Sequence, residues 1–241
     1  MSGVALDGSR QTKGIGTASY FFEVILLVLI FAVSHGSPPP DANEAHYLVK
    51  AKHYWNPEFG STDFFMSSAD AHLVFYWAFG WLTTLFELPV VAWIGRLLSW
   101  VLIGSALASI GRKLVGKRLA GLLLGTVFVV LTEYCHLAGE WVVGGFEAKT
   151  VAYGLVFWGI RMTLDGKWTH AWILTGCASA FHVLAGGWIV FCLLISRGTG
   201  LFKQKQRPEP IEVWSLILGG GIALGGLIPG LLLSSPDADI T

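Results

Sequence analysis

The chain has 241 residues, of which 54% are hydrophobic and 13% charged, and its mean hydropathy is +0.61. Soluble domains carry about 25% charged residues, so this composition excludes an ordinary soluble enzyme and predicts a polytopic membrane protein. Its 11 Trp and 15 Phe fit a chain that meets lipid and the membrane interfaces. The formal net charge is zero, and nothing in the pattern suggests nucleic acid. We therefore expect membrane lipid as a partner and the cell membrane as the location.

Residues 1–18 are polar and are predicted to form a disordered cytoplasmic tail. The apolar run over residues 20–34 is long enough to span a membrane if the helix begins a few residues earlier. The alternative is a cleaved signal peptide, because residues 32–34 resemble a small-residue cleavage site. The long polar segment before the run, and Glu23 within it, favour an uncleaved first helix. The fold class predicted for residues 19–241 is all-α, a bundle of about seven membrane segments.

Residues 35–71 form the only long polar segment between apolar runs. Three consecutive prolines stop the first helix, and Asp41 can cap a new one with Glu44 in capping-box position. We expect this helix over residues 42–55. It should lie as an amphipathic helix against the outer ends of the spans, within an outer loop.

A helical wheel of this segment separates two faces. Glu44 heads a stripe that continues with Tyr47 and Leu48, whereas Lys50 and His53 fall on the opposite, polar face. A carboxylate in an aromatic stripe has two interpretations. It either completes the cap and interacts with the helix dipole, or it is a functional acid.

The later apolar runs predict alternating crossings. Residues 72–86 are expected to lie partly in the outer leaflet, and spans are expected at 90–110, 119–135, 150–164 and 211–233. Residues 111–118 carry four basic and no acidic residues, so this loop is predicted to be cytoplasmic. Residues 35–71 carry five acidic residues against two lysines, which places them outside. The amino terminus is then cytoplasmic.

Residues 171–196 are ambiguous. As a single span they would place the basic residues of 197–207 outside. As a hairpin broken at Gly186-Gly187 they keep those residues inside, although each half is short for a span. We favour the hairpin because of the charge rule. His182, within this apolar run, is interpreted as a core histidine.

A second outer segment, residues 136–149, carries further acids. Glu140 and Glu147 are seven residues apart, which stacks them on one helical face, and His136 lies four residues before Glu140. Glu133, His136 and Glu140 have the spacing of a metal site on a helix. The alternative is a group of solvated interfacial side chains.

The order of several short motifs resembles the amino-terminal half of GT-C-type membrane glycosyltransferases, which take sugars from polyprenyl-phosphate donors. The matching residues are Asn43-Glu44 with Tyr47, Asp63-Phe64-Phe65, His72 with Phe75-Tyr76-Trp77, and Arg96. The resemblance covers about residues 20–165. The superfamily's usual Asp-Glu pair reads Asn43-Glu44 here, and its further spans and outer domain are not found. These departures indicate a fragment or a shortened, inactive relative.

The resemblance implies roles for several residues. Glu44 and Glu147 would be the catalytic acids, facing a common outer cavity with Arg96 or Lys149 close enough to bind phosphate. The candidates for substrate binding are Lys50, His53, His72, Arg96 and Lys149. A divalent metal, Mg²⁺ or Mn²⁺, would be held by Glu44, His136 and Glu140. The alternative function is a non-catalytic membrane subunit or lipid-binding protein whose outer helix only docks on the bundle.

Overall fold

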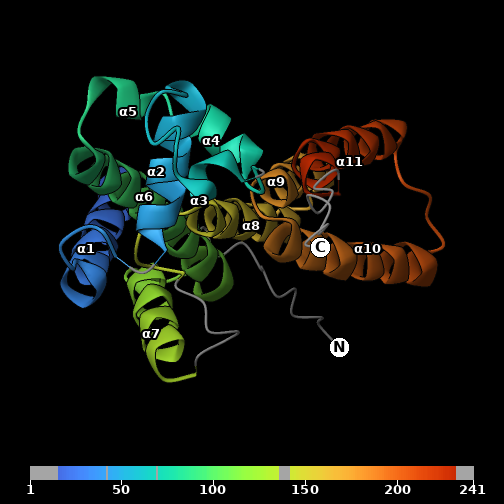
Figure 1. Cartoon of the computed structure of the whole chain (residues 1–241). Coiled ribbons are helices and arrows are strands. Elements are labelled where there is room, and N and C mark those ends of the chain that lie inside the picture. Colours follow the sequence, from blue (N-terminus) through green and yellow to red (C-terminus); the bar gives the residue numbers. More distant parts are fainter. Residues whose placement is uncertain (1–15, 42, 69, 136–141, 232–241) are drawn as a thin grey trace, which may run out of the picture.

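The computed structural model describes residues 16–231 except 42, 69 and 136–141, and the regular structure of these residues is entirely helical (Figure 1). The helices are, in chain order, α1 Thr17–His35, α2 Glu44–Trp55, α3 Phe64–Ser67, α4 Leu73–Phe79, α5 Leu82–Leu85, α6 Leu88–Val115, α7 Ala120–Cys135, α8 Ala148–Leu164, α9 Trp168–Phe181, α10 Val183–Gln204 and α11 Pro210–Leu231. The predicted all-α class is confirmed. Residues 17 and 18, expected in the disordered tail, already belong to α1, and residues 1–15 lie outside the described residues.

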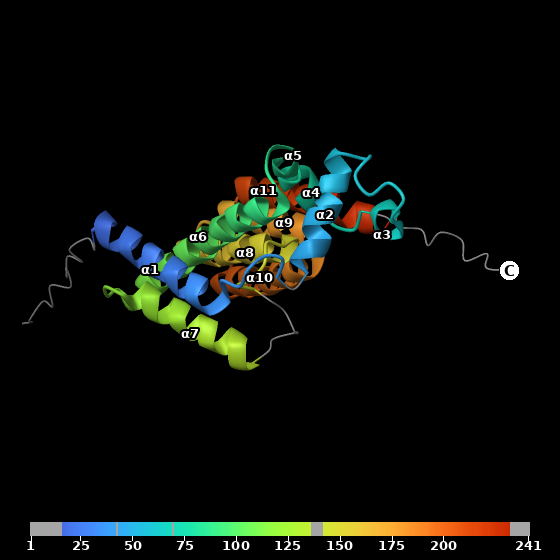
Figure 2. The same ribbon diagram turned by 60° about the vertical axis from the view of Figure 1, so that its left-hand side comes forward.

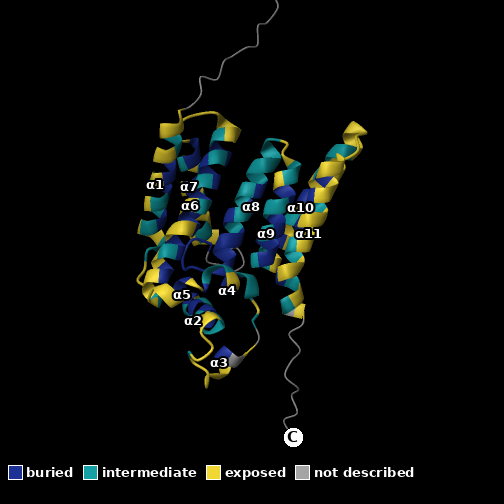
Figure 3. Cartoon of the chain, turned by 90° about the horizontal axis from the view of Figure 1, so that it is seen from above, coloured by how far each residue is buried: buried dark blue, intermediate teal, exposed yellow. Residues whose placement is uncertain are grey.

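The long helices alternate in direction. Glu23, early in α1, binds Arg112 near the end of α6, whereas Ser37, just after α1, accepts a hydrogen bond from Arg96 near the start of α6. These contacts make α1 and α6 antiparallel. Helices α6 and α8 are parallel, since Ser99 contacts Thr150 early in both and Ser109 binds Arg161 late in both. Figure 3 shows α2 to α5 gathered at one end of the bundle, which we call the loop end.

The opposite end, which we call the basic end, collects both basic segments. Lys113 Nζ lies 2.8 Å from Asp165 Oδ1, which joins the end of α6 to the turn between α8 and α9. Arg197 lies over the Trp168 ring, 5.1 Å from its centroid, and pairs with Glu212 at 2.6 Å. Residues 111–118 and 197–207 therefore share one end, as the positive-inside rule requires of loops on one side of a membrane.

Four helices of the described residues are long and apolar enough to cross a membrane: α1, α6, α10 and α11. Helix α7 is apolar but has only 16 residues, and α8 and α9 have 17 and 14. A crossing takes about 20 residues, so the lengths support a multi-pass membrane protein without fixing the number of crossings.

The break in residues 171–196 lies at His182, not at Gly186-Gly187. His182 has extended backbone between α9 and α10, and its Nδ1 accepts a hydrogen bond from Ala185 N at 3.2 Å, which caps α10. Gly186 lies inside α10, where a Cβ atom would come within 2.1 Å of Ser179 N. This glycine allows the two arms of the hairpin to approach closely, so it serves packing rather than chain reversal.

Helix α2 packs at the loop end, where it crosses the ends of neighbouring helices (Figures 2 and 3). Leu48 and Ala51 are buried with Phe75 and Val91. The helix begins at Glu44 with Asn43 as its N-cap, whereas Ala42, its predicted first residue, lies outside the described residues. The predicted helix is present from residue 44 onward, and its position at the outer membrane face stays a prediction.

Two short helices, α4 and α5, account for residues 72–86. They lie at the loop end, and Trp77 and Trp81 are exposed on them. Pro89 then occupies the first turn of α6, where a missing N–H costs no hydrogen bond. The predicted separation of this aromatic segment from the following span is therefore correct.

Candidate functional site

Glu44 is fully buried and has four N–H donors. Arg96 donates from Nε at 2.9 Å and from Nη2 at 2.5 Å, Phe146 N donates at 2.7 Å, and Asp41 N donates at 3.1 Å. Arg96 is also 0% exposed and donates its Nη1 proton to the Ser37 carbonyl. This ion pair joins α2, α6 and the segment before α8.

The geometry limits what Glu44 and Arg96 can do. A carboxylate with an Arg fork and two backbone donors has its lone pairs occupied, which leaves none free to bind a metal ion. The guanidinium is equally engaged with Glu44 and Ser37. The catalytic and phosphate-binding roles implied by the resemblance remain predictions, and the contacts seen are those of a joint that docks α2.

Glu147 is as deeply buried but is differently surrounded. It is the N-cap of α8, 1% exposed, and its side chain faces the Thr150 N–H in a capping-box arrangement. Its oxygens make no hydrogen bond of ordinary geometry among the described residues, although the backbone N–H and the side-chain amide of Asn43 approach the carboxylate closely enough to favour its charged form. Lys149 Nζ is 3.9 Å from Oε2. Burial, with a smaller contribution from the charge of Glu44, raises the pKa of Glu147 from 4.5 to about 7, although Asn43 opposes the rise.

The two acids lie close together, but neither the cavity beside Glu44 nor the groove at Lys149 has Glu147 in its lining. Glu44 accepts a hydrogen bond from Phe146 N, the residue directly before Glu147. A cavity of about 270 Å³ beside Glu44 is otherwise lined by apolar residues of α2, α6 and the proline turn, among them Pro40 and Leu88. Neither this cavity nor the groove at Lys149 includes both acids in its lining.

A polar cluster surrounds Glu147 at the loop end. Tyr47 Oη and His72 Nε2 are 3.0 Å apart, and the rings of His72 and His182 are nearly parallel, with 6.1 Å between centroids. Burial lowers the pKa of His72, and burial together with His72 and Lys149 lowers the pKa of His182 to about 4. Burial and then the charge of Glu147 raise the pKa of Tyr47. At neutral pH both histidines are therefore uncharged hydrogen-bonding groups.

An elongated groove opens beside this cluster, between α8 and α10. Its volume is about 390 Å³. The residues that line it are Lys149, Tyr153, Val156, His182, Leu184, Ala185, Trp188, Ile189 and Cys192. Lys149 and His182 supply polar groups at the loop end, and most of the remaining wall is apolar. Such a groove suits an amphiphile with an anionic head and a hydrocarbon tail.

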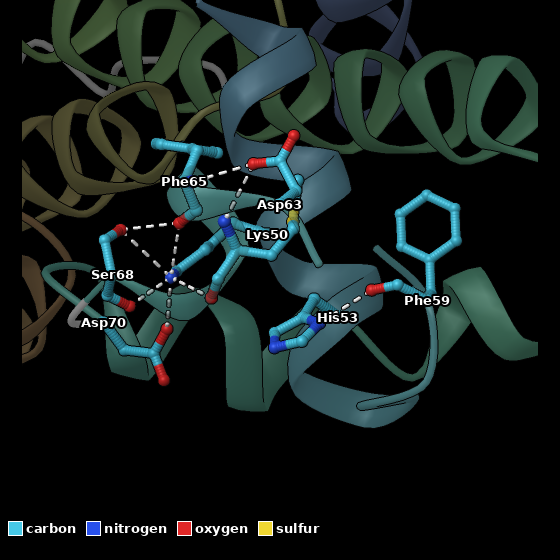
Figure 4. Close-up of polar contacts among 8 residues, drawn as sticks. Lys50, His53, Phe59, Asp63, Phe65, Ser68 and Asp70 are labelled. Carbon is cyan, nitrogen blue, oxygen red and sulfur yellow. Dashed lines mark hydrogen bonds and ion pairs between the residues drawn. The ribbon is translucent and has the colours of Figure 1, made fainter. Parts of the chain in front are cut away.

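Lys50 and His53 hold the loop between α2 and α4 in place (Figure 4). Lys50 is only 2% exposed, although the wheel placed it on the polar face. Its ammonium donates to the carbonyls of Phe65 at 3.0 Å, Met66 at 2.7 Å and Ser68. It also pairs with Asp70 at 3.5 Å.

His53 Nδ1 lies 2.7 Å from the Phe59 carbonyl and donates to it. Lys50 and His53 are thus bound to the chain itself in this arrangement. Their assignment to substrate remains a prediction.

The predicted metal set can be examined only in part. His136 and Glu140 lie outside the described residues. Within the described part of the chain, no group of three His, Cys, Asp or Glu side chains is placed to hold a metal ion. Glu133, the other acid at that spacing, pairs with His35 at 3.0 Å. Glu44 is the one member of the predicted set that the structure describes. It does not fit a metal ligand, because its oxygens already accept four hydrogen bonds.

Sequence reasoning found Glu147, Lys149 and His72 but missed His182 and the hydroxyl of Tyr47 as members of the same cluster. The signal that could have found His182 is its position as a polar residue near the middle of the apolar run of residues 171–196, where a hairpin must break. No protein-family model, curated protein or solved structure matches this chain. The site geometry is therefore the basis for assigning a function.

Proposed function

We propose that this chain is a multi-pass membrane protein that binds a polyprenyl-phosphate-linked sugar at the loop end and takes part in its transfer. The observation that carries the proposal is the position of Glu147. It is a buried carboxylate with a pKa of about 7, 3.9 Å from the ammonium of Lys149, and Lys149 lines the polar end of the groove between α8 and α10. Perturbed acids of this kind are frequent at catalytic sites.

The proposed topology has seven crossings, by α1 and by α6 to α11. The basic end faces the cytoplasm together with the amino terminus, and the loop end with α2 faces outward. The two basic segments at one end support this orientation. The short helices α8 and α9 would cross in the interior of the bundle, where neighbouring helices shield their polar ends.

The proposed reaction uses Glu147 as general base. Its carboxylate takes the proton of an acceptor hydroxyl as that oxygen bonds to the anomeric carbon of the sugar. The bond between the anomeric carbon and the phosphate oxygen breaks, and its electron pair leaves on the lipid phosphate. Lys149 stabilises that phosphate, and the groove holds the polyprenyl chain. A base with a pKa of about 7 is matched to neutral pH.

This proposal gives Glu44 and Arg96 a positioning role. By fixing α2 and the N–H of Phe146, they hold the segment that carries Glu147. The chemistry needs positive charge at the leaving phosphate, and Lys149 supplies it among the described residues. A Mg²⁺ or Mn²⁺ ion stays a prediction that concerns His136 and Glu140, and no step here passes through it.

The test is a transfer assay in nanodiscs that contain the purified chain and a polyprenyl-phosphate sugar. We expect release of polyprenyl phosphate at a rate that rises with pH through about 7, where Glu147 ionises. Glu147→Gln should lower turnover at least 100-fold and leave donor binding unchanged, since general-base catalysis contributes about 10²–10⁴-fold. Lys149→Gln should weaken donor binding. Glu87→Gln, at an exposed acid that precedes α6 at the same end, is the control. Turnover unaffected by Glu147→Gln would refute the proposal.

A second candidate is a non-catalytic membrane subunit or lipid-binding protein. The occupied carboxylate of Glu44 favours it, because the first acid implied by the resemblance serves as a docking joint. In that case the same assay would detect donor binding that depends on Lys149 but no turnover in any variant.

A further inference from the structure

His182 lies at the loop end of the groove between α8 and α10, directly before the first residue of α10. Its backbone is extended, and its Nδ1 accepts a hydrogen bond from Ala185 N at 3.2 Å. A neutral imidazole that accepts at one nitrogen carries its proton on the other. The helix cap therefore fixes the tautomer of His182, and its Nε2 is an N–H donor.

This Nε2–H donor is open to a ligand. Among the described residues His182 makes no hydrogen bond besides the one at Nδ1, and its Nε2 is not one of the enclosed polar atoms that lack a partner. The nitrogen is therefore accessible, and His182 is one of the residues that line the groove. The ring is also held in place, because it lies nearly parallel to the His72 ring with 6.1 Å between centroids. A fixed donor without a protein acceptor is suited to orient a ligand.

The groove extends from this donor toward the middle of the bundle. On α10 its lining continues from His182 to Cys192, which is about 15 Å at 1.5 Å per residue, and on α8 it continues from Lys149 to Val156. Helices α8 and α10 both begin at the loop end, so Lys149 and His182 lie together at one end and the mostly apolar wall follows. A lipid with its head group at the loop end and its hydrocarbon chain in the adjacent leaflet has the same order of polarity.

The head of the groove carries one full positive charge. Lys149 supplies it, and no acidic side chain of the described residues lines the groove. Burial, together with His72 and Lys149, lowers the pKa of His182 to about 4, so its ring is neutral at pH 7. The amino-terminal end of α10 adds a partial positive charge. Two side-chain donors with a single charge match an anion that has one negative charge.

We propose that His182 is a phosphate-binding residue, which donates its Nε2–H to one oxygen of a lipid phosphodiester while Lys149 pairs with another, and that this pair selects a monophosphate over a diphosphate linkage. The identity of the lipid as a polyprenyl-linked sugar rests on the function proposed above. A phosphodiester has one negative charge, whereas a diphosphate diester has two, and the second would lie in a partly buried groove without a partner. His182 thus has two tasks, since one nitrogen caps α10 and the other binds phosphate.

Two substitutions separate these tasks. His182→Asn keeps a short acceptor for the Ala185 N–H, as a good N-cap does, but removes the donor at the position of Nε2. His182→Gln keeps an N–H donor near that position, but glutamine is not a favoured N-cap. Both variants lose the ring contact with His72, so this contact cancels when the two are compared.

The measurement is the binding of a polyprenyl-phosphate mannose to the full chain in phosphatidylcholine nanodiscs, together with thermal unfolding. We expect His182→Asn to bind about tenfold more weakly than His182→Gln, because a hydrogen bond to a charged group contributes at this level. Its melting temperature should nevertheless be about 2–4 °C higher, since it retains the cap. His170→Asn, at an exposed histidine of α9, is the control. Affinities that follow the melting temperatures would overturn the proposal, because His182 would then be a cap alone.

The charge match is tested with the diphosphate-linked counterpart of the same probe. The unmodified chain should bind the monophosphate probe roughly tenfold more tightly, and a preference for the diphosphate would overturn the proposed selection. Excess phosphatidylglycerol should not displace the probe. Equal displacement would assign the phosphodiester site to an ordinary phospholipid, which would refute the function proposed above but not the role of His182. Binding that follows the expected pattern without any turnover would support this site and refute the proposed reaction.

Discussion

Glu44 and Glu147 are almost equally buried at the same end of the bundle, yet their surroundings are opposite. Glu44 receives four N–H groups, two of them from the Arg96 guanidinium. Glu147 has a cation 3.9 Å away, and among the described residues the donors of Asn43 and Thr150 approach its oxygens without ordinary hydrogen-bond geometry. Burial alone therefore does not indicate function, because a buried acid with all its donors is a structural joint.

The same contrast extends to the groups around each acid. The Glu44 joint connects three segments that are distant in sequence and leaves its cation fully enclosed. The surroundings of Glu147 hold two neutral histidines, a tyrosine and a groove that opens along α10. The hydrogen bonds of Glu44 include one from Phe146 N, so they hold the adjacent Glu147 in place. At Glu147 the burial of the carboxylate is not offset by hydrogen bonds of ordinary geometry, and burial therefore raises its pKa.

The largest expected effect follows from breaking the joint. Arg96→Met leaves Glu44 as a buried charge with backbone donors only, and loss of one partner of a buried pair costs about 3–5 kcal/mol. We expect the melting temperature in detergent to fall by about 10 °C, since 1 kcal/mol corresponds to about 2–4 °C in a domain of this size. The exposed Arg118→Met is the control. Adding Glu44→Gln to Arg96→Met should restore part of the loss, and no recovery would mean that charge is not the cause.

A smaller effect, with a definite dependence on pH, is expected at Glu147. Its folded pKa of about 7 lies above the ordinary 4.5, so the folded state holds the proton more tightly. The free energy of unfolding should be highest below pH 4.5, fall between pH 4.5 and about 7, and then level off. The full difference is about 3 kcal/mol.

Glu147→Gln cannot ionise, so its unfolding curve should be flat through that window and lie above the wild-type curve beyond pH 7. Thermal unfolding in detergent at several pH values measures this, with Glu133→Gln as a control that should keep the slope. A wild-type slope that persists in Glu147→Gln would assign the titration to another group.

The sequence predicted the elements better than it predicted the contacts. Composition and charge indicated a helical membrane bundle with both basic segments at one end, because hydropathy and loop charge are local properties. The helix after the prolines was predicted for a similar reason, through its capping acids. The partner of Glu44 could not be predicted, because Arg96 lies 52 residues away and only the packing of α2 on α6 brings them together.

Two particular predictions were wrong for physical reasons. Lys50 was placed on a solvated face, but the returning chain at residues 65–68 covers it with carbonyl groups, which a helical wheel cannot represent. The hairpin break was placed at Gly186-Gly187 because glycine often interrupts helices. In a membrane bundle glycine also permits close packing, and the break is at the extended His182.

The smallest expected effect tests whether the cluster at Glu147 is held together by its own hydrogen bonds. Tyr47→Phe removes the hydroxyl that lies 3.0 Å from His72 Nε2, and loss of such a bond costs about 0.5–1.5 kcal/mol. We expect a fall in melting temperature of a few degrees, with Tyr54→Phe on the same helix as the matched control. Loss of the hydroxyl should also leave the His72 ring less fixed against His182, so the NMR signals of both rings should shift in Tyr47→Phe. If only the His72 signals shift, the parallel rings do not act as a unit, and the cluster is centred on Glu147 and Lys149 alone.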